Sequence, residues 1–226
     1  LDDARAMRDA ARKRRRKVKT FVWFNYRRCP AVALAHQLVA EGRLGDIHHV
    51  RATYLQEWGG PETPLLWRFR KKNAGCGAHG DLNADIIDMA RFVLGDEVKE
   101  VNGAIARTFV KERKLLSGKG TGRSTVDDAV LFLATFKKGA VASFEASRVA
   151  HGHQNRNTLE VNGTLGSLRF DFEDMNLLWF PDANDDPRPR GWRRVPCTGR
   201  AVHPSPGNWW PAAPAPGYEP RLVHLR

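Results

Sequence analysis

The chain of 226 residues contains only three cysteines and no long apolar run. Cys29, Cys76 and Cys197 are far apart and form no C-x-x-C pair, which argues against a disulfide framework or a zinc ribbon and indicates a reducing cytoplasm. No apolar stretch approaches the length of a membrane span, and the charged opening LDDARAMRDAARKRRRK is no secretory signal. We therefore expect a cytoplasmic globular protein without a membrane partner.

The chain also lacks nucleic-acid-binding motifs, although its net charge is +12. A run between residues 12 and 19 holds seven Lys and Arg residues, and such a run can bind phosphate backbones. No aromatic residue interleaves it, however, and cations also favour the C-terminal end of a helix. We interpret the run as the solvated end of a helix and expect no specific nucleic-acid partner.

The hydrophobic pattern predicts helices first and strands afterwards. Helical spacing at the start of the chain is followed by strand composition over residues 17–24, and Pro30 opens a helix from Ala31 to Glu41. Strand-like segments cover residues 47–58, 98–110, 126–136, 140–147, 158–161, 167–172 and 177–180, with a charged loop over 111–125 and a hairpin signal at 162–166. This order predicts an α+β fold, with an open, mostly antiparallel sheet and helices packed on one face. Ten of the 13 prolines follow residue 180, so we expect the end of the chain to be loosely ordered.

The stretch GCGAHGDLNADIID, residues 75–88, is the strongest candidate for a site. Its glycines allow tight turns and admit a ligand, and Asp81 stands where a helix N-cap is expected. Leu82, Ile86, Met89 and Val93 then recur at helical spacing up to the stop signal Gly95. Asp81, Asp85 and Asp88 line one edge of that apolar face, which predicts a polar site beside the helix.

Two other interpretations of this stretch are weaker. Residues 75–80 match G-x-G-x-x-G, but the preceding WRFRKKNA is no buried strand, and Asp81 and Asp85 would repel a pyrophosphate at the helix start. We reject a dinucleotide site in this loop and favour a neutral, hydroxyl-rich ligand. Asp81, Asp85 and His79 could bind a divalent cation, which remains a minor alternative; we predict no metal.

Several longer segments resemble a known family. They are FNYRRCPAVALA, VRATYLQEW, WRFRK, GDLNADIIDMARF, TFVKER, TVDDAVLF, the run from FEASR to NGTLGSLRFDFEDMN, GNWWP and GYE. In this order they resemble the C-terminal, substrate-binding part of the glucose–fructose oxidoreductase/inositol dehydrogenase (Gfo/Idh/MocA) family, most of all its levoglucosan-dehydrogenase-type members. The resemblance extends over nearly the whole chain up to Glu219.

The resemblance implies an NAD(P)-dependent oxidoreductase that removes hydride from a CH–OH group of a sugar, anhydrosugar or cyclitol. It implies NAD or NADP as cofactor, and homo-oligomers formed through the open sheet. Residues 1–25 would be the remnant of a truncated Rossmann domain, its last helix and strand. Residues 26–180 would form the substrate-binding and oligomerisation domain, and residues 181–226 a Pro-rich C-terminal segment.

By position in the family motifs, Tyr26, Gln56, Trp58 and Arg68 would line the sugar pocket. Asp81 corresponds to the motif aspartate near the reacting hydroxyl, and with Asp85 it is the predicted catalytic pair. A base within hydrogen-bond reach is needed, because hydride leaves carbon only as the hydroxyl proton is taken.

The chain departs from the family pattern at the predicted catalytic pair. Asp85 stands where the family has histidine and Asn83 where it has glycine, and the chain contains neither the E-K-P motif nor a nucleotide-binding fingerprint after a strand. Two hypotheses follow from the sequence. The chain is either the substrate-binding part of a dehydrogenase, or a non-catalytic fragment or oligomerisation module with weak sugar binding.

Overall fold

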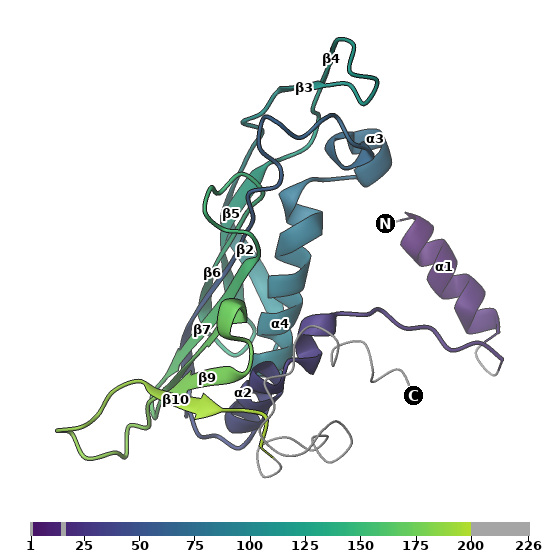
Figure 1. Cartoon of the computed structure of the whole chain (residues 1–226). Helices are drawn as coiled ribbons and strands as arrows, with labels where there is room; N and C mark the ends of the chain where they lie inside the picture. The colour runs from purple at the N-terminus through teal and green to yellow at the C-terminus, as the bar shows by residue number, and fades with distance from the viewer. Residues whose placement is uncertain (1, 15–16, 200–226) are drawn as a thin grey trace.

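A computed structural model describes residues 2–14 and 17–199 of the chain (Figure 1). Its helices are α1 (Asp2–Lys13), α2 (Pro30–Ala40), α3 (Lys71–Ala74) and α4 (Ala84–Leu94), with 3₁₀ turns η1 (Asn25–Arg28), η2 (Trp67–Phe69) and η4 (Phe172–Asp174) and a π-helical turn η3 (His79–Asn83). Its strands are β1 (Ile47–Leu55), β2 (Val98–Arg107), β3 (Glu112–Lys114), β4 (Thr121–Arg123), β5 (Ala129–Phe136), β6 (Val141–Ser147), β7 (Arg156–Gly163), β8 (Ser167–Asp171), β9 (Leu177–Phe180) and β10 (Arg193–Pro196).

Eight of the strands form one sheet in the order β10-β9-β8-β7-β1-β6-β5-β2. Every neighbouring pair in it is antiparallel except β1 and β6, which run parallel with Ala52 opposite Phe144. Helices α2 and α4 lie on one side of this sheet, as Figure 1 shows. The predicted open, mostly antiparallel sheet with helices on one face is therefore confirmed.

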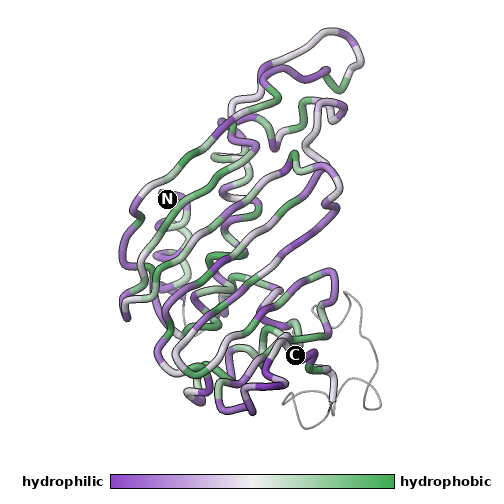
Figure 2. The backbone as a smooth tube through the Cα atoms, turned by 90° about the vertical axis from the view of Figure 1, so that its left-hand side faces the viewer, coloured by the Kyte–Doolittle hydropathy of each residue, from purple (hydrophilic) through white to green (hydrophobic). Residues whose placement is uncertain are grey.

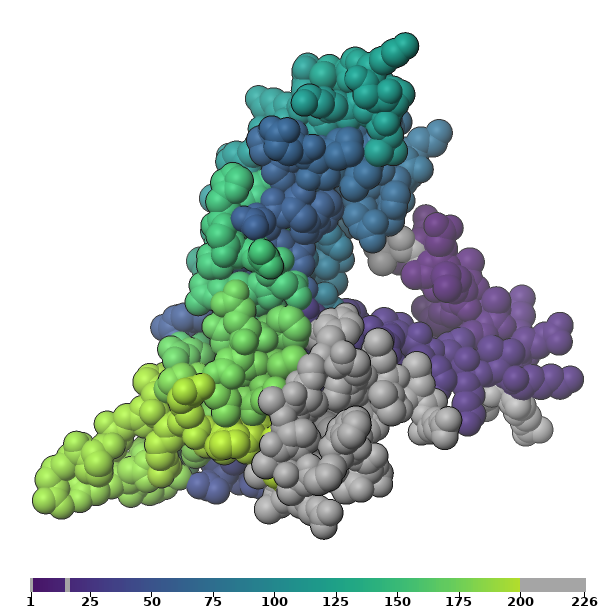
Figure 3. All heavy atoms as spheres, in the orientation of Figure 1, coloured from purple at the N-terminus to yellow at the C-terminus, as the bar shows by residue number. Residues whose placement is uncertain are grey.

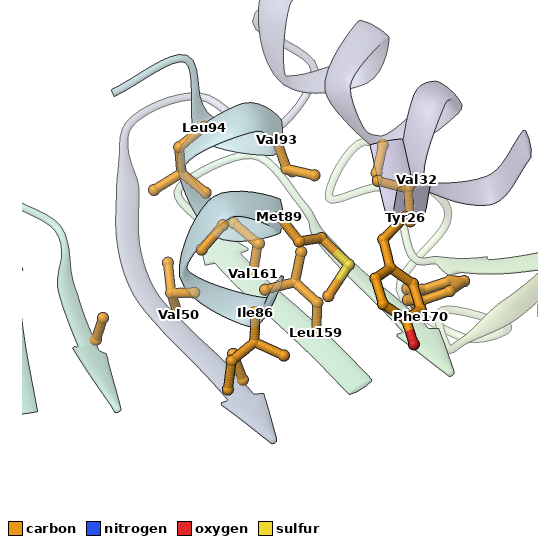
Figure 4. Packing of buried hydrophobic residues seen from close by; sticks show 14 of the residues in the cluster. Tyr26, Val32, Val50, Ile86, Met89, Val93, Leu94, Leu159, Val161 and Phe170 are labelled. Atoms are coloured by element: carbon orange, nitrogen blue, oxygen red, sulfur yellow. The ribbon is translucent and has the colours of Figure 1, made fainter. Parts of the chain in front are cut away.

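The core lies between these two helices and the sheet. From α4, Ile86, Met89 and Val93 are fully buried, and Leu82 just before them is 2% exposed. Figure 4 shows Ile86, Met89 and Val93 beside apolar side chains of the strands, among them Val50, Leu159, Val161 and Phe170. Helix α4 ends at Gly95, whose φ of 56° lies in the left-handed region that glycine adopts readily. The predicted apolar face and stop of this helix are confirmed.

Two short pairings were not expected from the sequence. Within the charged loop 111–125, β3 and β4 form a two-stranded hairpin of their own, and β10 adds an edge strand beside β9. Their sequences, ERK, TGR and RRVP, carry little strand signal. Such short polar strands form because their surroundings offer backbone partners, and alternation of apolar residues does not reveal them.

The N-terminal segment differs from its prediction. Helix α1 forms with all of its side chains outside the core, but residues 17–24 form no strand. A strand exists through hydrogen bonds to a neighbouring strand, and no part of the described chain supplies one there. Phe21 and Val22 are 76% and 83% exposed. The space-filling view shows α1 and this connecting segment standing away from the sheet (Figure 3).

The far side of the sheet is open. Figure 2 looks onto this face, and no helix of the described chain covers it. Strand β2 is exposed along nearly its whole length, and the exposed apolar residues of β2, β5 and β6 are Val101, Ile105, Leu131, Leu133 and Val141.

None of the described helices is long and apolar enough to span a bilayer. The end of the chain predicted to be loose, including Trp209 and Trp210, lies outside the described residues from 200 onward.

Candidate functional site

The candidate site begins at the π-helical turn η3, which carries Asp81. The chain is already helical at Ala78, and Asp81 lies inside the turn, so the prediction that Asp81 is a helix N-cap is wrong. The capping role falls instead to Asp127, whose carboxylate accepts the backbone N–H groups of Gly77 (2.9 Å) and His79 (2.8 Å). Its carbonyl O accepts the N–H of Ala78 at 3.0 Å. Single π-helical turns inside helices occur frequently at functional sites.

The same contacts show whether the loop 75–80 has backbone N–H groups available to bind the pyrophosphate of a dinucleotide. The N–H groups of Gly77, Ala78 and His79 are already bonded to Asp127, two of them to its carboxylate, and the elements before the loop are η2 and α3 rather than a strand. A Cβ at Gly77 would overlap the carbonyl O of Asp127, so the loop packs directly against its neighbour. The loop does not fit a pyrophosphate, which agrees with its rejection from the sequence.

Arg148 connects Asp81 to the sheet. It follows β6, its side chain is 1% exposed, and its Nη2 donates to the carbonyl O of Asp127 at 3.0 Å. Its Nη1 lies 3.7 Å from Oδ2 of Asp81, whose side chain is 36% exposed. Burial lowers the pKa of Arg148, while the nearby carboxylates, Asp81 first among them, oppose this shift. A buried cation thus contacts a partly exposed candidate catalytic carboxylate.

A second row of polar contacts starts at Trp58. The indole N–H can only donate, and it donates to Oε1 of Gln56 at 2.6 Å. Nε2 of Gln56 therefore points the other way and donates to Oδ1 of Asn155 at 2.6 Å. The same Oδ1 accepts the hydroxyl of Tyr54 at 2.8 Å. With the Tyr54 proton used in this way, the 2.6 Å contact between the two tyrosine hydroxyls is donated by Tyr26.

The two rows meet at Trp58. Its ring lies beside the guanidinium of Arg148, with 5.2 Å from Cζ to the ring centroid. Side chains from η1, the end of β1 and the residues after it, η3, and the loop between β6 and β7 thus form one connected array. All of them are predicted site residues or direct partners of one. Its members are Tyr26, Tyr54, Gln56, Trp58, Asp81, Arg148 and Asn155.

Other candidate residues lie outside this array. Arg68 is exposed, and its guanidinium stacks on the exposed ring of Trp67, with 4.5 Å from Cζ to the ring centroid. His79 is exposed and meets Phe132 edge-on at 6.3 Å. Asp85 is half-buried in the first turn of α4, four residues after Asp81. In the described ranges no group of three or more His, Cys, Asp or Glu residues is arranged to hold a metal ion.

Asp88 has a structural partner. Its carboxylate, 3% exposed, accepts Nε of Arg27 at 2.7 Å and Nη2 at 2.5 Å. The hydrogen bond to Asp88 raises the pKa of Arg27 despite partial burial. This ion pair fastens η1, and with it Tyr26, to helix α4.

A second buried arginine supports the loop on the other side of Trp58. Arg113, 1% exposed, lies over the ring of Phe69 and donates to the carbonyl groups of Gly59, Gly60 and Thr63. It also pairs with the fully buried Asp128 at 3.3 Å, which in turn accepts the N–H groups of Phe109 and Val110. Trp58 packs against the small apolar cluster around Phe69 that these contacts hold together.

Three members of the connected array, Tyr54, Arg148 and Asn155, were not singled out from the sequence, nor was the capping residue Asp127. Alternation along β1 could have found Tyr54, because residues two apart face the same side of a strand. Asp127, Arg148 and Asn155 lie 46 to 74 residues beyond Asp81, and no local pattern marks them as its neighbours.

Known proteins share this fold. The family model described as the GFO/IDH/MocA C-terminal domain matches residues 32–169. Levoglucosan dehydrogenase of Pseudarthrobacter phenanthrenivorans is 42% identical over 93% of this chain, which covers 56% of that protein. An oxidoreductase domain protein from Kribbella flavida superposes with a TM-score of 0.90 at 49% identity, over 97% of this chain and 58% of the other. A structure of levoglucosan dehydrogenase with NADH and L-sorbose gives a TM-score of 0.84 at 44% identity, over 91% and 54% of the two chains.

The sheet with helices on one side is thus the C-terminal domain fold of a class of oxidoreductases. The chain belongs to the Gfo/Idh/MocA family. It spans slightly more than half the length of the levoglucosan dehydrogenase that it matches.

Proposed function

We propose that this chain is the substrate-binding part of an NAD(P)-dependent oxidoreductase that acts on a CH–OH group of a sugar, anhydrosugar or cyclitol. The observation that carries the proposal is the connected array from Tyr26 to Asp81, a row of hydrogen-bonding side chains with an aromatic ring at its centre. Sugars are bound by such combinations of fixed polar groups and ring faces. The levoglucosan dehydrogenase relative supports a sugar as ligand.

In this proposal Asp81 accepts a hydrogen bond from the reacting hydroxyl and favours loss of its proton. Asp85, one helical turn further, is the second catalytic residue. Tyr26, Gln56 and Arg68 hold the other hydroxyls, and Trp58 offers its ring face, because its N–H is already donated to Gln56. NAD or NADP would accept the hydride, and no residue of the described chain is assigned to it.

We further propose the division into residues 1–25, 26–180 and 181–226 stated above, a cytoplasmic location, and homo-oligomers formed through the open sheet face. The exposed apolar side chains there are the support for self-association, since burying them removes apolar surface from water. Leu133→Lys should keep the protein folded and reduce self-association in sedimentation velocity. Unchanged sedimentation would place any self-association elsewhere.

A second candidate is a non-catalytic module that binds a sugar weakly. The observation behind it is Asp85 in place of the histidine expected from the family motif. Aspartate carboxyl groups ordinarily titrate at about pH 4, so they accept protons poorly near neutrality compared with histidine.

Both candidate functions require sugar binding, which isothermal titration of the purified chain measures. The ligands are levoglucosan, glucose and myo-inositol, with NAD⁺ and NADP⁺ titrated separately. We expect binding of a sugar, and weaker binding to Asp81→Asn. Glu41→Gln, an exposed carboxylate at the end of α2, is the matched control and should bind as the unmodified chain does. Failure of all three sugars to bind refutes the proposal. Turnover with a sugar and NAD(P)⁺ argues against the non-catalytic module.

A further inference from the structure

We propose that Arg148 is the positioning residue for Asp81: its buried guanidinium fixes the direction of the Asp81 carboxylate towards a ligand hydroxyl. The inference rests on the proposed function of Asp81 and adds a residue to that site. Arg148 touches no ligand in this proposal and acts through Asp81.

The first argument is the burial of the charge. A guanidinium that is 1% exposed is stable only where protein groups replace its hydration. Nη2 of Arg148 donates to the carbonyl O of Asp127, and the ring centroids of Trp58 and Phe69 lie 5.2 and 5.1 Å from its Cζ. Its Nε has no hydrogen-bond partner in the described part of the chain. The Asp81 carboxylate lies 3.7 Å from Nη1 of Arg148 and, ahead of Asp128 and Asp127, is the main negative charge that balances this buried cation.

The second argument is geometry. A guanidinium is a rigid planar fork, so fixing one of its nitrogen atoms fixes the direction of the others. The bond of Nη2 to Asp127 and the two flanking rings set the plane of Arg148, and Nη1 then faces Oδ2 of Asp81. This leaves Oδ1 of Asp81 for a ligand hydroxyl. At 3.7 Å the contact is an ion pair and longer than a hydrogen bond.

The third argument is that Asp127 holds both members of the pair. Its carboxylate fixes the N–H groups of Gly77 and His79 at the start of η3, while its carbonyl O fixes Arg148. A shift of the turn would therefore change the Asp81–Arg148 separation directly.

The chain supplies its own matched control in Arg113. It is equally buried, lies over the same Phe69 ring and pairs with a carboxylate, but that carboxylate is Asp128. Loss of Arg113 disturbs the same apolar cluster without removing a partner of Asp81.

The test is a double-mutant cycle on levoglucosan binding, measured by isothermal titration of the purified chain. Arg148→Met should weaken binding about tenfold in the unmodified chain and by less than about twofold in the Asp81→Asn background, because its effect passes through Asp81. Arg113→Met should have the same small effect in both backgrounds. Arg148→Lys, which keeps the charge and loses the planar fork, should fall between the unmodified chain and Arg148→Met.

Equal weakening by Arg148→Met in both backgrounds, or no weakening, would overturn the proposal. If Arg148→Met does not fold, the same cycle with Arg148→Lys decides the question. If the unmodified chain binds no levoglucosan, the proposed function fails on that ligand, and the pair is tested by urea unfolding instead. Arg148 and Asp81 should then be coupled by about fivefold in the unfolding equilibrium constant; additive effects would refute a positioning contact.

Discussion

Gly77→Ala is the substitution that tests most directly whether the loop before Asp81 is held as described. A Cβ at this position would overlap the carbonyl O of Asp127 and lie 2.7 Å from Nη2 of Arg148, inside the 3.0 Å limit for real Cβ contacts. Both neighbours are anchored, so the loop itself must move. Its N–H bonds to Asp127, from Gly77, Ala78 and His79 at 2.9, 3.0 and 2.8 Å, are then lost or weakened.

The expected loss of stability follows from those three bonds. Two of them end on a charged carboxylate, worth about 1.5–3 kcal/mol each when buried, and the third on a carbonyl, worth about 1 kcal/mol. Because Asp127 is half-buried and water replaces part of the loss, we expect about 3 kcal/mol less unfolding free energy. Sugar binding should fall as well, since the N–H of Asp81 donates to the carbonyl O of Gly77 at 3.0 Å.

Urea unfolding followed by circular dichroism measures this difference. Gly60→Ala is the control, because a Cβ there meets nothing closer than the carbonyl O of Glu57 at 3.5 Å, an ordinary contact. It should change stability by less than about 0.5 kcal/mol. A Gly77→Ala chain as stable as the Gly60→Ala chain would refute the close packing of the loop against Asp127.

Three further predictions concern other groups. Cys197 is fully buried, which raises its pKa to about 12, and Cys29 is equally buried. Iodoacetamide at pH 8 should therefore modify only the half-exposed Cys76 in the folded chain, and all three cysteines in guanidinium chloride. Mass spectrometry counts the adducts, and rapid labelling of Cys197 in the native state would contradict its burial. The hydrogen bond from Arg91 lowers the pKa of Glu97, so this pair stabilises the fold at neutral pH, and its contribution is lost as the pH falls through that lowered pKa. Glu97→Gln should therefore reduce the unfolding free energy more at pH 7 than at pH 3. Equal reductions at both pH values would argue against the pair. Asn155→Leu removes the acceptor shared by Tyr54 and Gln56, and should weaken sugar binding and change the intrinsic tryptophan fluorescence, to which Trp58 contributes. Asn155→Asp keeps that acceptor and should leave the fluorescence close to that of the unmodified chain.

Local patterns in the sequence were sufficient for most of the secondary structure. Pro30 at the start of α2, Gly95 at the end of α4 and the apolar spacing from Leu82 to Val93 each state a short-range preference, and the structure follows all three. The antiparallel sheet could likewise be predicted, since hairpin signals such as the turn at 162–166 join strands that are neighbours in the chain.

Contacts between distant segments could not be predicted in this way. The sequence suggested that Asp81 caps its own helix, but the cap comes from Asp127, 46 residues later, and the strand composition of residues 17–24 found no partner to pair with. The parallel pairing of β1 with β6 likewise joins segments almost a hundred residues apart.

The sequence by itself determined most of the elements, the family and the chemical types available at the site: carboxylates at 81 and 85, an amide at 56 and an indole at 58. Only the tertiary structure decided that Arg148 and Asn155 complete the array, that Asp88 belongs to an ion pair with Arg27, and that Arg68 stacks on Trp67. The reason is physical: helical and strand preferences act between residues a few positions apart, whereas the partner of a buried charge is chosen by which segments the packed sheet brings together.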